Sequence, residues 1–367
     1  MRIAILGSVV LPVPPPGQGG TEWIAFYQAR GLARLGHEVL LFAPKGSLEE
    51  GYKLIKTQSS RLRRGFGGQA KLKVQNQNLN LKSEYLESSR KLRVENVYLA
   101  EVIEKLIELK DEYDVILNNM RGEAVLLPVA KLLGKPLVNV MHLPIFEELA
   151  GVFKKYNTPL ITISNNQRKN YPDLNYLATV YNCVDTEKFT FNPNVRGEEE
   201  YLLMVGTVGR HKNQGAAIRV AKKLGMKLVL AGKIRDQDYY EELKKDIDGK
   251  NIIWHGELDF YKKVELYQNA AVFLFPILWE EPFGLVMIEA MACGTPVVAF
   301  ANGAIPEVVV YGKTGFVIKN NSEKEMAEAI KKVGEIKRQD CRNHVMENFT
   351  IEKMVGGYEE ALKIIVD

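Results

Sequence analysis

The sequence predicts two doubly wound α/β domains that follow one another along the chain. Short apolar stretches of strand length alternate with longer stretches of helical periodicity, often with glycine between them. This alternation stops near Asp185–Glu199 and then starts again. The length of 367 residues also fits two domains of roughly 150 residues each. Such domains bind ligands at the carboxyl ends of their strands, so we expect a site in a cleft between them.

The first half opens with a strand, a loop, a helix and a second strand. Arg2–Gly7 is a short apolar run that ends in glycine, which predicts a buried parallel strand. The loop Leu11–Glu22 contains four prolines and three glycines, which exclude regular structure there. Glu22–Leu35 has helical periodicity, and Gly36 follows it as a C-cap. The other elements that we expect in this half are strand Glu38–Ala43, helix Val97–Leu109, strand Asp114–Asn118, helix Ala124–Leu133, and strands Leu137–Met141 and Leu160–Ser164.

The second half repeats the alternation after the joint at Asp185–Glu199, which is polar and lacks periodicity. We expect strands at Tyr201–Val205, Lys227–Ala231, Ile252–His255, Val272–Pro276 and Pro296–Phe300. The helices that we expect are Gln214–Leu224, Tyr239–Asp248, Lys262–Asn269, Leu285–Cys293, Glu323–Ile336 and Ile351–Ile365. We therefore place the first domain at residues 1–180 and the second at 181–350.

The composition excludes several classes of protein. With 46% hydrophobic and 26% charged residues, the chain is not disordered throughout, collagenous or a coiled coil. The longest apolar run, near Ala270–Trp279, is about half of the roughly 20 residues that span a bilayer. The N-terminus lacks a small-residue cleavage site, so we expect no signal peptide. The three cysteines are far apart, which predicts neither disulfides nor a zinc site and favours a cytoplasmic location.

The net charge of +4 comes from one window, Lys53–Lys82, which has eight Lys or Arg and no Asp or Glu. The rest of the chain has a net charge of −4. The window fits a solvated loop and helix face, or a surface that docks to anionic lipid headgroups, where each cation gains about 1 kcal/mol. We expect no nucleic acid as a partner, because only Phe66 could stack on bases and no recognition motif is present.

The segment Trp279–Phe300 has the strongest functional pattern. Glu281 and Glu289 are eight residues apart, and the chain between them turns from a strand end into a helix that starts near Leu285. Free backbone N–H groups at that helix start suit a diphosphate, and carboxylates accept hydrogen bonds from sugar hydroxyls. The alternative is that Glu281 is a solvated loop residue and Glu289 a surface helix residue. Against it, the helix around Glu289 is unusually apolar, so this carboxylate needs a partner or a ligand.

A glycine loop follows the first strand. Gly17, Gly19 and Gly20 let the backbone approach donor phosphates or an acceptor. The loop lacks the G-x-G-x-x-G spacing, which argues against a nicotinamide site. Glu22 fits a structural role at the start of the next helix at least as well as a catalytic one.

The motif E-P-F-G-L-V-M-I-E-A-M-A-C-G-T-P-V-V-A resembles the paired-glutamate signature of retaining GT-B glycosyltransferases, glycosyltransferase family four in particular. The opening, PVPPPGQGGTE followed by GLARLGHEVLLFAP, is similar to the acceptor domain of the avilamycin-type branch. Two other segments, YNCVDTEKF and GAIPEVVVYGKTGF, resemble the family's interdomain joint and the segment after its signature helix. The resemblance therefore spans the chain.

This resemblance implies a GT-B fold, with two Rossmann-like domains facing a central cleft and the last helix, 351–367, packed back on the first domain. It assigns Glu281 to the donor sugar and Glu289 to the nucleotide ribose. It assigns the sugar and the phosphates to backbone N–H groups at the helix start, and the base to residues 253–258. The donor-binding residues of this helix start are Phe283, Gly284, Leu285 and Val286.

In the family, the loop with the pattern G-R-L-x-x-x-K-G binds the donor diphosphate through its arginine and lysine, and we call this pair the phosphate clamp. The corresponding loop here, residues 206–213, departs from that pattern. Lys212 matches the lysine, but Thr207 stands where the family has arginine. Arg210, three residues later, could supply the second charge, because a leaving diphosphate needs fixed positive groups nearby. The alternative is an ordinary basic surface loop.

The resemblance also places a histidine near the donor sugar, and His142 follows the strand Leu137–Met141 at the cleft end of its sheet. A structural role for His142 is the alternative. Neither the histidines nor the Asp and Glu residues have metal-ligand spacing, and family members generally work without a metal. We expect no metal and no cofactor.

The expected activity is retaining, metal-independent transfer of a hexose from a UDP- or GDP-type sugar to a glycan or lipid-linked acceptor. An epimerase or a pyridoxal-dependent phosphorylase on the same fold is one alternative. A nucleotide-sugar or glycan binding protein without turnover is another, which Thr207 at the clamp keeps open.

Overall fold

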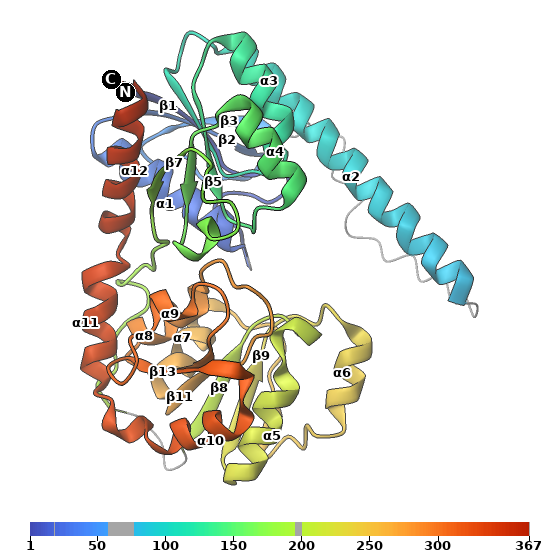
Figure 1. The fold of residues 1–367 in the computed structure, drawn as a ribbon, viewed down its shortest axis with the longest axis vertical. Coiled ribbons are helices and arrows are strands. Elements are labelled where there is room, and N and C mark those ends of the chain that lie inside the picture. The colour runs from blue at the N-terminus through green and yellow to red at the C-terminus, as the bar shows by residue number, and fades with distance from the viewer. Residues whose placement is uncertain (18, 58–76, 195–199, 367) are drawn as a thin grey trace.

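The computed structural model describes residues 1–17, 19–57, 77–194 and 200–366. It contains two parallel sheets with helices on both faces, one above the other in Figure 1. The predicted fold class is therefore confirmed. Most of the basic window Lys53–Lys82 lies outside the described residues.

The first domain is built on a seven-stranded sheet with the order β3-β2-β1-β4-β5-β6-β7. Its strands are β1 (Arg2–Leu6), β2 (Glu38–Pro44), β3 (Lys53–Thr57), β4 (Val115–Asn118), β5 (Leu137–Met141), β6 (Leu160–Thr162) and β7 (Tyr176–Thr179). Its helices are α1 (Gly20–Arg34), α2 (Gln77–Glu108), α3 (Glu123–Leu133) and α4 (Glu147–Tyr156), with a 3-10 turn, η2, at Asn166–Arg168. The strand order reverses between β1 and β4, and a ligand crevice is expected at such a point.

The second domain has a six-stranded sheet with the order β10-β9-β8-β11-β12-β13. Its strands are β8 (Tyr201–Val205), β9 (Lys227–Ala231), β10 (Ile252–Trp254), β11 (Val272–Phe275), β12 (Val297–Phe300) and β13 (Gly315–Ile318). Its helices are α5 (Gln214–Leu224), α6 (Gln237–Lys244), α7 (Phe260–Asn269), α8 (Leu285–Ala292), α9 (Ile305–Val308), α10 (Glu323–Lys331) and α11 (Arg338–Asn348), with 3-10 turns η3 (Arg210–Lys212), η4 (Lys319–Asn321) and η5 (Val333–Glu335).

The last helix, α12 (Ile351–Val366), leaves the second domain and lies along the first (Figure 1). It packs closely on α1, because a Cβ at Gly31 would lie 2.3 Å from Cγ2 of Val355. His37 Nε2 also lies 2.9 Å from Oε1 of Glu359 on α12. The C-terminal helix thus ties the two domains together.

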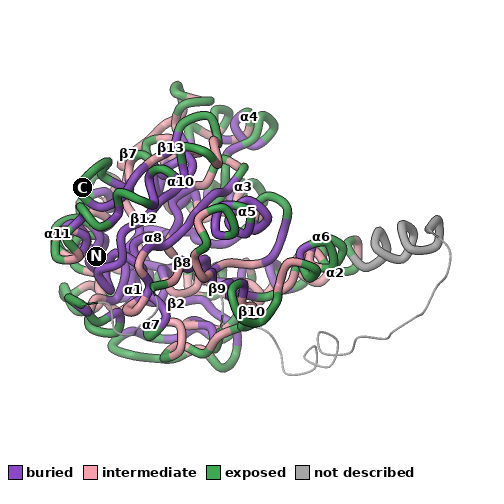
Figure 2. Tube along the Cα trace, turned by 90° about the horizontal axis from the view of Figure 1, so that it is seen from below, coloured by how far each residue is buried: buried purple, intermediate pink, exposed green. Residues whose placement is uncertain are grey.

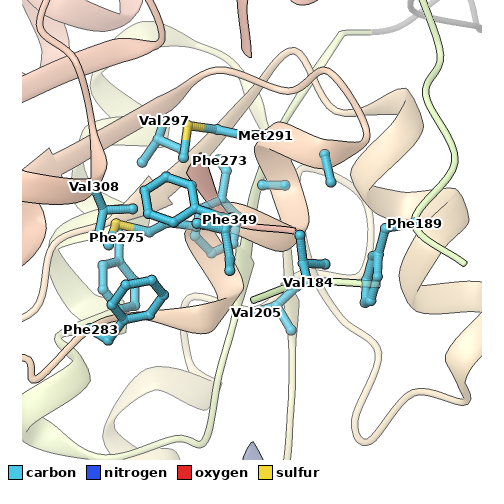
Figure 3. Packing of buried hydrophobic residues seen from close by; sticks show 14 of the residues in the cluster. Val184, Phe189, Val205, Phe273, Phe275, Phe283, Met291, Val297, Val308 and Phe349 are labelled. Carbon is cyan, nitrogen blue, oxygen red and sulfur yellow. The ribbon is translucent and has the colours of Figure 1, made fainter. Parts of the chain in front are cut away.

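The central strands are buried on both faces, which is why they are nearly continuous apolar runs (Figure 2). Figure 3 shows the second-domain core and the aromatic residues near the domain joint. There the ring centroids of Phe283 and Phe349 are 5.8 Å apart, and Tyr181 of the joint lies 6.0 Å from Phe283. The chain that leads into the candidate site is therefore anchored in the core.

Candidate active site

Glu281 lies in the turn between β11 and α8, and its backbone is fixed by contacts with the segment after β12. Gly284, at φ 88°, takes the left-handed conformation immediately before α8. Gly303, at φ 68°, lies so close that a Cβ on it would be 2.3 Å from both the N and the O of Glu281. The N–H of Ala304 donates to the Glu281 carbonyl at 2.8 Å. Gly303 was not predicted as a site residue, although it opens the segment GAIPEVVV that resembles the family.

The side chain of Glu281 has two donors on one oxygen. Lys212 Nζ lies 3.1 Å and Trp279 Nε1 lies 3.0 Å from Oε2. The Glu281 and Lys212 side chains are only 12% and 17% exposed. The ammonium group also lies 5.4 Å from the centroid of the Phe275 ring. Glu281 is therefore a held, half-buried carboxylate and not a solvated loop residue.

Glu289 is held in a similar way by two side chains of α7. Lys263 Nζ contacts Oε1 at 3.0 Å, and the Tyr267 hydroxyl donates to Oε2 at 3.0 Å. Burial, and then the neighbouring Glu289 carboxylate, raise the pKa of Tyr267 well above its usual value, so its hydroxyl stays a donor. The apolar helix therefore carries a paired carboxylate. Neither Lys263 nor Tyr267 was predicted from the sequence.

Lys212 reaches Glu281 because two loops are fastened together. Lys212 ends the turn η3, and the following Asn213 takes the left-handed conformation at φ 61°. The Asn213 amide donates to the carbonyl of Pro276 at 3.0 Å. The N–H of Leu278 donates to the carbonyl of His211 at 2.9 Å. These bonds fix the η3 loop against the loop that carries Glu281.

Arg210 lies outside both Glu281 contacts and pairs with a carboxylate of α6. Its guanidinium bonds the Glu242 carboxylate of α6, with one contact at 3.1 Å, and lies 5.1 Å from the Tyr239 ring centroid. Its side chain is 59% exposed. Thr207 lies nearer the cleft, and its carbonyl accepts a hydrogen bond from Gln214 at 2.9 Å. The structure therefore brings Lys212, but not Arg210, to Glu281.

His142 lies on the first-domain side of the cleft. Its Nε2 is 2.9 Å from Oδ1 of Asn119, whose amide nitrogen donates to Gln28 at 2.8 Å. Burial lowers the pKa of His142 to about 4, so the ring is neutral at neutral pH. Glu22 accepts a hydrogen bond from Ser8 at 3.2 Å, and burial raises the pKa of this carboxyl.

Two adjacent pockets lie between the domains. The larger, of about 990 Å³, is lined by the glycine loop, α1, the domain joint, α7 and the start of α8. The smaller, of about 290 Å³, lies between His142 and Glu281. Gly20, Lys212 and Leu285 line both, and a Cβ at Gly20 would lie 2.8 Å from Cδ1 of Leu285. The glycine loop therefore touches the start of α8.

The predicted site residues divide between these pockets, with Arg210 outside both. The larger pocket is lined by Gly19, Gly20, Thr207, Lys212, Leu285, Val286 and Glu289. The smaller is lined by Gly20, His142, Lys212, Glu281, Phe283, Gly284, Leu285 and Val286. None of residues 253–258, expected near the base, is among the described residues that line either pocket. Gly17 also lines the larger pocket.

Two features are absent from the described residues. No three His, Cys, Asp or Glu side chains there gather in a group that could hold a metal ion. Among the described helices, none is both long and apolar enough to cross a bilayer.

Comparison with known proteins gives a family match for part of the chain. Residues 185–348 match the family glycosyl transferases group 1. An uncharacterized glycosyltransferase of Methanocaldococcus jannaschii is 28% identical over 194 residues, which are 51% of this chain and 48% of that protein. The chain spans about half the length of the curated relatives it matches.

Solved structures match the whole chain. AviGT4, a glycosyltransferase involved in avilamycin A biosynthesis, has a TM-score of 0.71 and 20% identity, with coverage of 99% of this chain and 97% of that one. HepE of Anabaena, in complex with UDP and glucose, has a TM-score of 0.71, 18% identity and 99% coverage of both chains. Residues 185–348 thus match the glycosyl transferases group 1 family, and the whole chain has the GT-B fold of its structural neighbours.

Proposed function

We propose that this chain is a retaining glycosyltransferase that moves a hexose from a nucleotide-sugar donor to an acceptor hydroxyl without a metal. One observation carries the proposal. The start of α8 lies between two held carboxylates, with Glu281 in one interdomain pocket and Glu289 in the other. This arrangement offers acceptors for sugar and ribose hydroxyls on either side of N–H groups that suit a diphosphate.

The donor would span both pockets. The nucleotide would lie in the larger pocket with its ribose on Glu289, and the hexose in the smaller pocket between Glu281 and His142. The diphosphate would then lie beside Lys212, which lines both. The complex of HepE with UDP and glucose supports this class of donor.

In the proposed reaction the bond between the anomeric carbon and the diphosphate breaks. The acceptor oxygen attacks from the same face, and the leaving phosphate takes the acceptor proton. Lys212 and the N–H groups at the α8 start would stabilise the charge that develops on the diphosphate. Arg210 would add a second charge only by leaving Glu242.

Within the larger class, we place the chain in glycosyltransferase family four, near the avilamycin-type branch. The motifs quoted above and the similarity to AviGT4 support this placement. The acceptor would be a glycan or a lipid-linked sugar, bound on the first domain in the cytoplasm.

An anionic membrane surface would contact the window Lys53–Lys82. Lys53, the first residue of this window, is described by the structure, and its Nζ lies 2.6 Å from Oε2 of Glu112. The charge of this lysine is therefore partly neutralised. Flotation with neutral and anionic liposomes tests the contact. We expect recovery only with anionic lipid, and equal recovery with both would remove the membrane from the proposal.

A thermal-shift panel with UDP-, GDP- and ADP-hexoses tests the donor site. We expect one donor to raise the melting temperature, and Glu289→Gln to reduce that rise because a ribose acceptor loses its charge. Glu265→Gln is the matched control, since Glu265 lines the larger pocket but pairs with Lys262 at its exposed rim. Stabilisation without release of nucleoside diphosphate, with acceptors present, would favour a binding protein. No stabilisation by any donor would contradict the proposed site.

A further inference from the structure

We propose that Trp279 is a positioning residue that fixes Glu281 and Lys212 in their working geometry. This inference rests on the proposed function and adds a residue to it. The indole N–H would hold one oxygen of Glu281, so that the other faces the bound hexose. The indole face would hold the ammonium group of Lys212 beside it.

The two side-chain donors that contact the Glu281 carboxylate bind the same oxygen. Both Trp279 Nε1, at 3.0 Å, and Lys212 Nζ, at 3.1 Å, donate to Oε2. In the described part of the chain, no protein donor contacts Oε1. A carboxylate oxygen without a donor, in the wall of a pocket, is available to accept from a ligand hydroxyl. Rotation of the carboxylate would exchange its two oxygens, and the two donors oppose that rotation.

The same ring orients Lys212. The ammonium nitrogen lies 5.2 Å from the Trp279 ring centroid and 5.4 Å from that of Phe275. A cation over an aromatic face is attracted by the ring electrons, more strongly away from bulk water. Lys212 is thus placed by two rings and one carboxylate, close to the proposed diphosphate.

Trp279 is itself held in place. It is half-buried and lines the smaller pocket, and its ring meets the His211 ring at 82° with centroids 6.0 Å apart. The preceding residue, Leu278, donates its N–H to the carbonyl of His211. The indole therefore has a fixed direction before any ligand binds, as a positioning group requires.

Two substitutions separate the two roles of the indole. Trp279→Phe keeps an aromatic face and removes the N–H, so Glu281 loses a donor while Lys212 keeps a ring. We expect kcat to fall about tenfold to a hundredfold, since small misplacements at a reacting centre have effects of that size. The donor KM should stay within about twofold, because Glu289 and its partners are unchanged. Trp279→Leu removes the face as well and should also weaken the binding of UDP.

Tyr176→Phe is the matched control, because it also removes one donor and keeps an aromatic ring. Tyr176 lies on β7, where its hydroxyl donates to the carbonyl of Tyr171 at 2.9 Å and the Arg168 guanidinium lies 4.9 Å from its ring centroid. It lines neither pocket among the described residues. We expect kcat and KM to be unchanged in this variant. Equal losses in both variants, or an unchanged kcat in Trp279→Phe, would overturn the assignment.

A spectroscopic test does not depend on turnover. The chain has three tryptophans, so an amide spectrum of the 15N-labelled protein should show three indole N–H signals. The signal missing from Trp279→Phe belongs to Trp279, and Glu281→Gln should shift that signal more than the other two. If it does not move, the proposed bond is absent and the inference fails. If it moves while no donor is turned over, the proposed function fails and the positioning contact stands.

Discussion

Lys212 and Arg210 are two positions apart and have opposite surroundings. Lys212 lies inside the cleft against Glu281, whereas Arg210 bonds Glu242 on the exposed side of the loop. We expect Lys212→Met to lower kcat about a hundredfold, since it removes a fixed charge at the leaving group. Arg210→Ala should change kcat by no more than about threefold. Rates of nucleoside diphosphate release measure both. A large loss in Arg210→Ala would show that Arg210 leaves Glu242 and completes the clamp.

His142 makes stability depend on pH in a known direction. Its pKa is about 4 in the folded chain and near 6.5 when unfolded, so the unfolded chain binds the extra proton between these values. Its contribution to stability is present above pH 6.5 and is lost as the pH falls towards 4. The melting temperature of His142→Gln should therefore fall less on acidification than that of the wild type. The exposed His255 provides the control, and His255→Gln should follow the wild type. Parallel curves for His142→Gln and the wild type would contradict a ring that stays neutral in the folded chain.

The functional role of Glu281, Glu289 and Lys212 stays a prediction from the sequence, which did not indicate the side chains that hold them in place. Lys263 and Tyr267 belong to another helix, and no local pattern indicates which of its faces meets α8. Trp279 is two residues from Glu281, but the direction of its N–H depends on a turn that only the packed loop defines. The outward position of Arg210 follows from Glu242, 32 residues away.

At the scale of elements, Gly303 couples the segment after β12 to the loop that carries Glu281. Alanine at 303 would meet the Glu281 backbone at 2.3 Å and would also have to adopt φ 68°. Gly312 is the matched control, because it has φ 73° and a Cβ placed on it would meet nothing within 4 Å. We expect Gly312→Ala to lower the free energy of unfolding by about 1 kcal/mol, through the left-handed backbone alone. Gly303→Ala should cost roughly 1–3 kcal/mol more and lower kcat.

Chemical denaturation and initial rates check this pair of variants. The loss of kcat should appear only in Gly303→Ala, because only there is the Glu281 backbone displaced. If the two variants behaved alike, Gly303 would have no role in placing Glu281.

Most core strands and helices were predicted from their apolar patterns, but helix α4 and strands β7 and β13 were not predicted, although β13 is a buried apolar strand. The edge strand β3 exposes Lys53 and Lys56, which hides its strand pattern. Helix α11 has few apolar residues. On the side that packs against the domain, Arg338 and Arg342 donate to backbone carbonyls in place of apolar contacts. The helix expected over Glu323–Ile336 ends at Lys331 and continues as the 3-10 turn η5.

For the whole molecule, the restart of the strand and helix alternation was enough to predict two domains, but not how they contact each other. Glu307 of α9 accepts from the backbone N–H groups of Asn165 and Asn166 at 2.8 and 2.7 Å. The Tyr181 hydroxyl donates to the same carboxylate at 3.0 Å. One side chain thus joins the domains beside their connection. Asn165 and Asn166 follow β6 in the other domain, so no pattern within either half predicts the contact.

Removing this carboxylate should loosen the contact between the domains. In Glu307→Ala the amides of Asn165 and Asn166 should exchange with solvent about tenfold faster, since a hydrogen bond to a charged group is worth roughly 1.5–3 kcal/mol. Glu280→Ala is the control, because the Glu280 carboxylate accepts from the Asn166 side chain, at 3.2 Å, and not from the backbone N–H groups that Glu307 holds. Hydrogen exchange of a peptide that covers residues 160–170 measures both. Unchanged exchange in Glu307→Ala would mean that other contacts hold the domains.

The central claim is that Lys212 and the start of α8 stabilise a leaving diphosphate in the interdomain cleft. The most direct measurement is nucleoside diphosphate release from UDP-, GDP- and ADP-hexoses, by the wild type and Lys212→Met, with and without EDTA. The account predicts release from one donor that EDTA does not change and that the substitution reduces about a hundredfold. Release that stops with EDTA, or that Lys212→Met leaves intact, would contradict it.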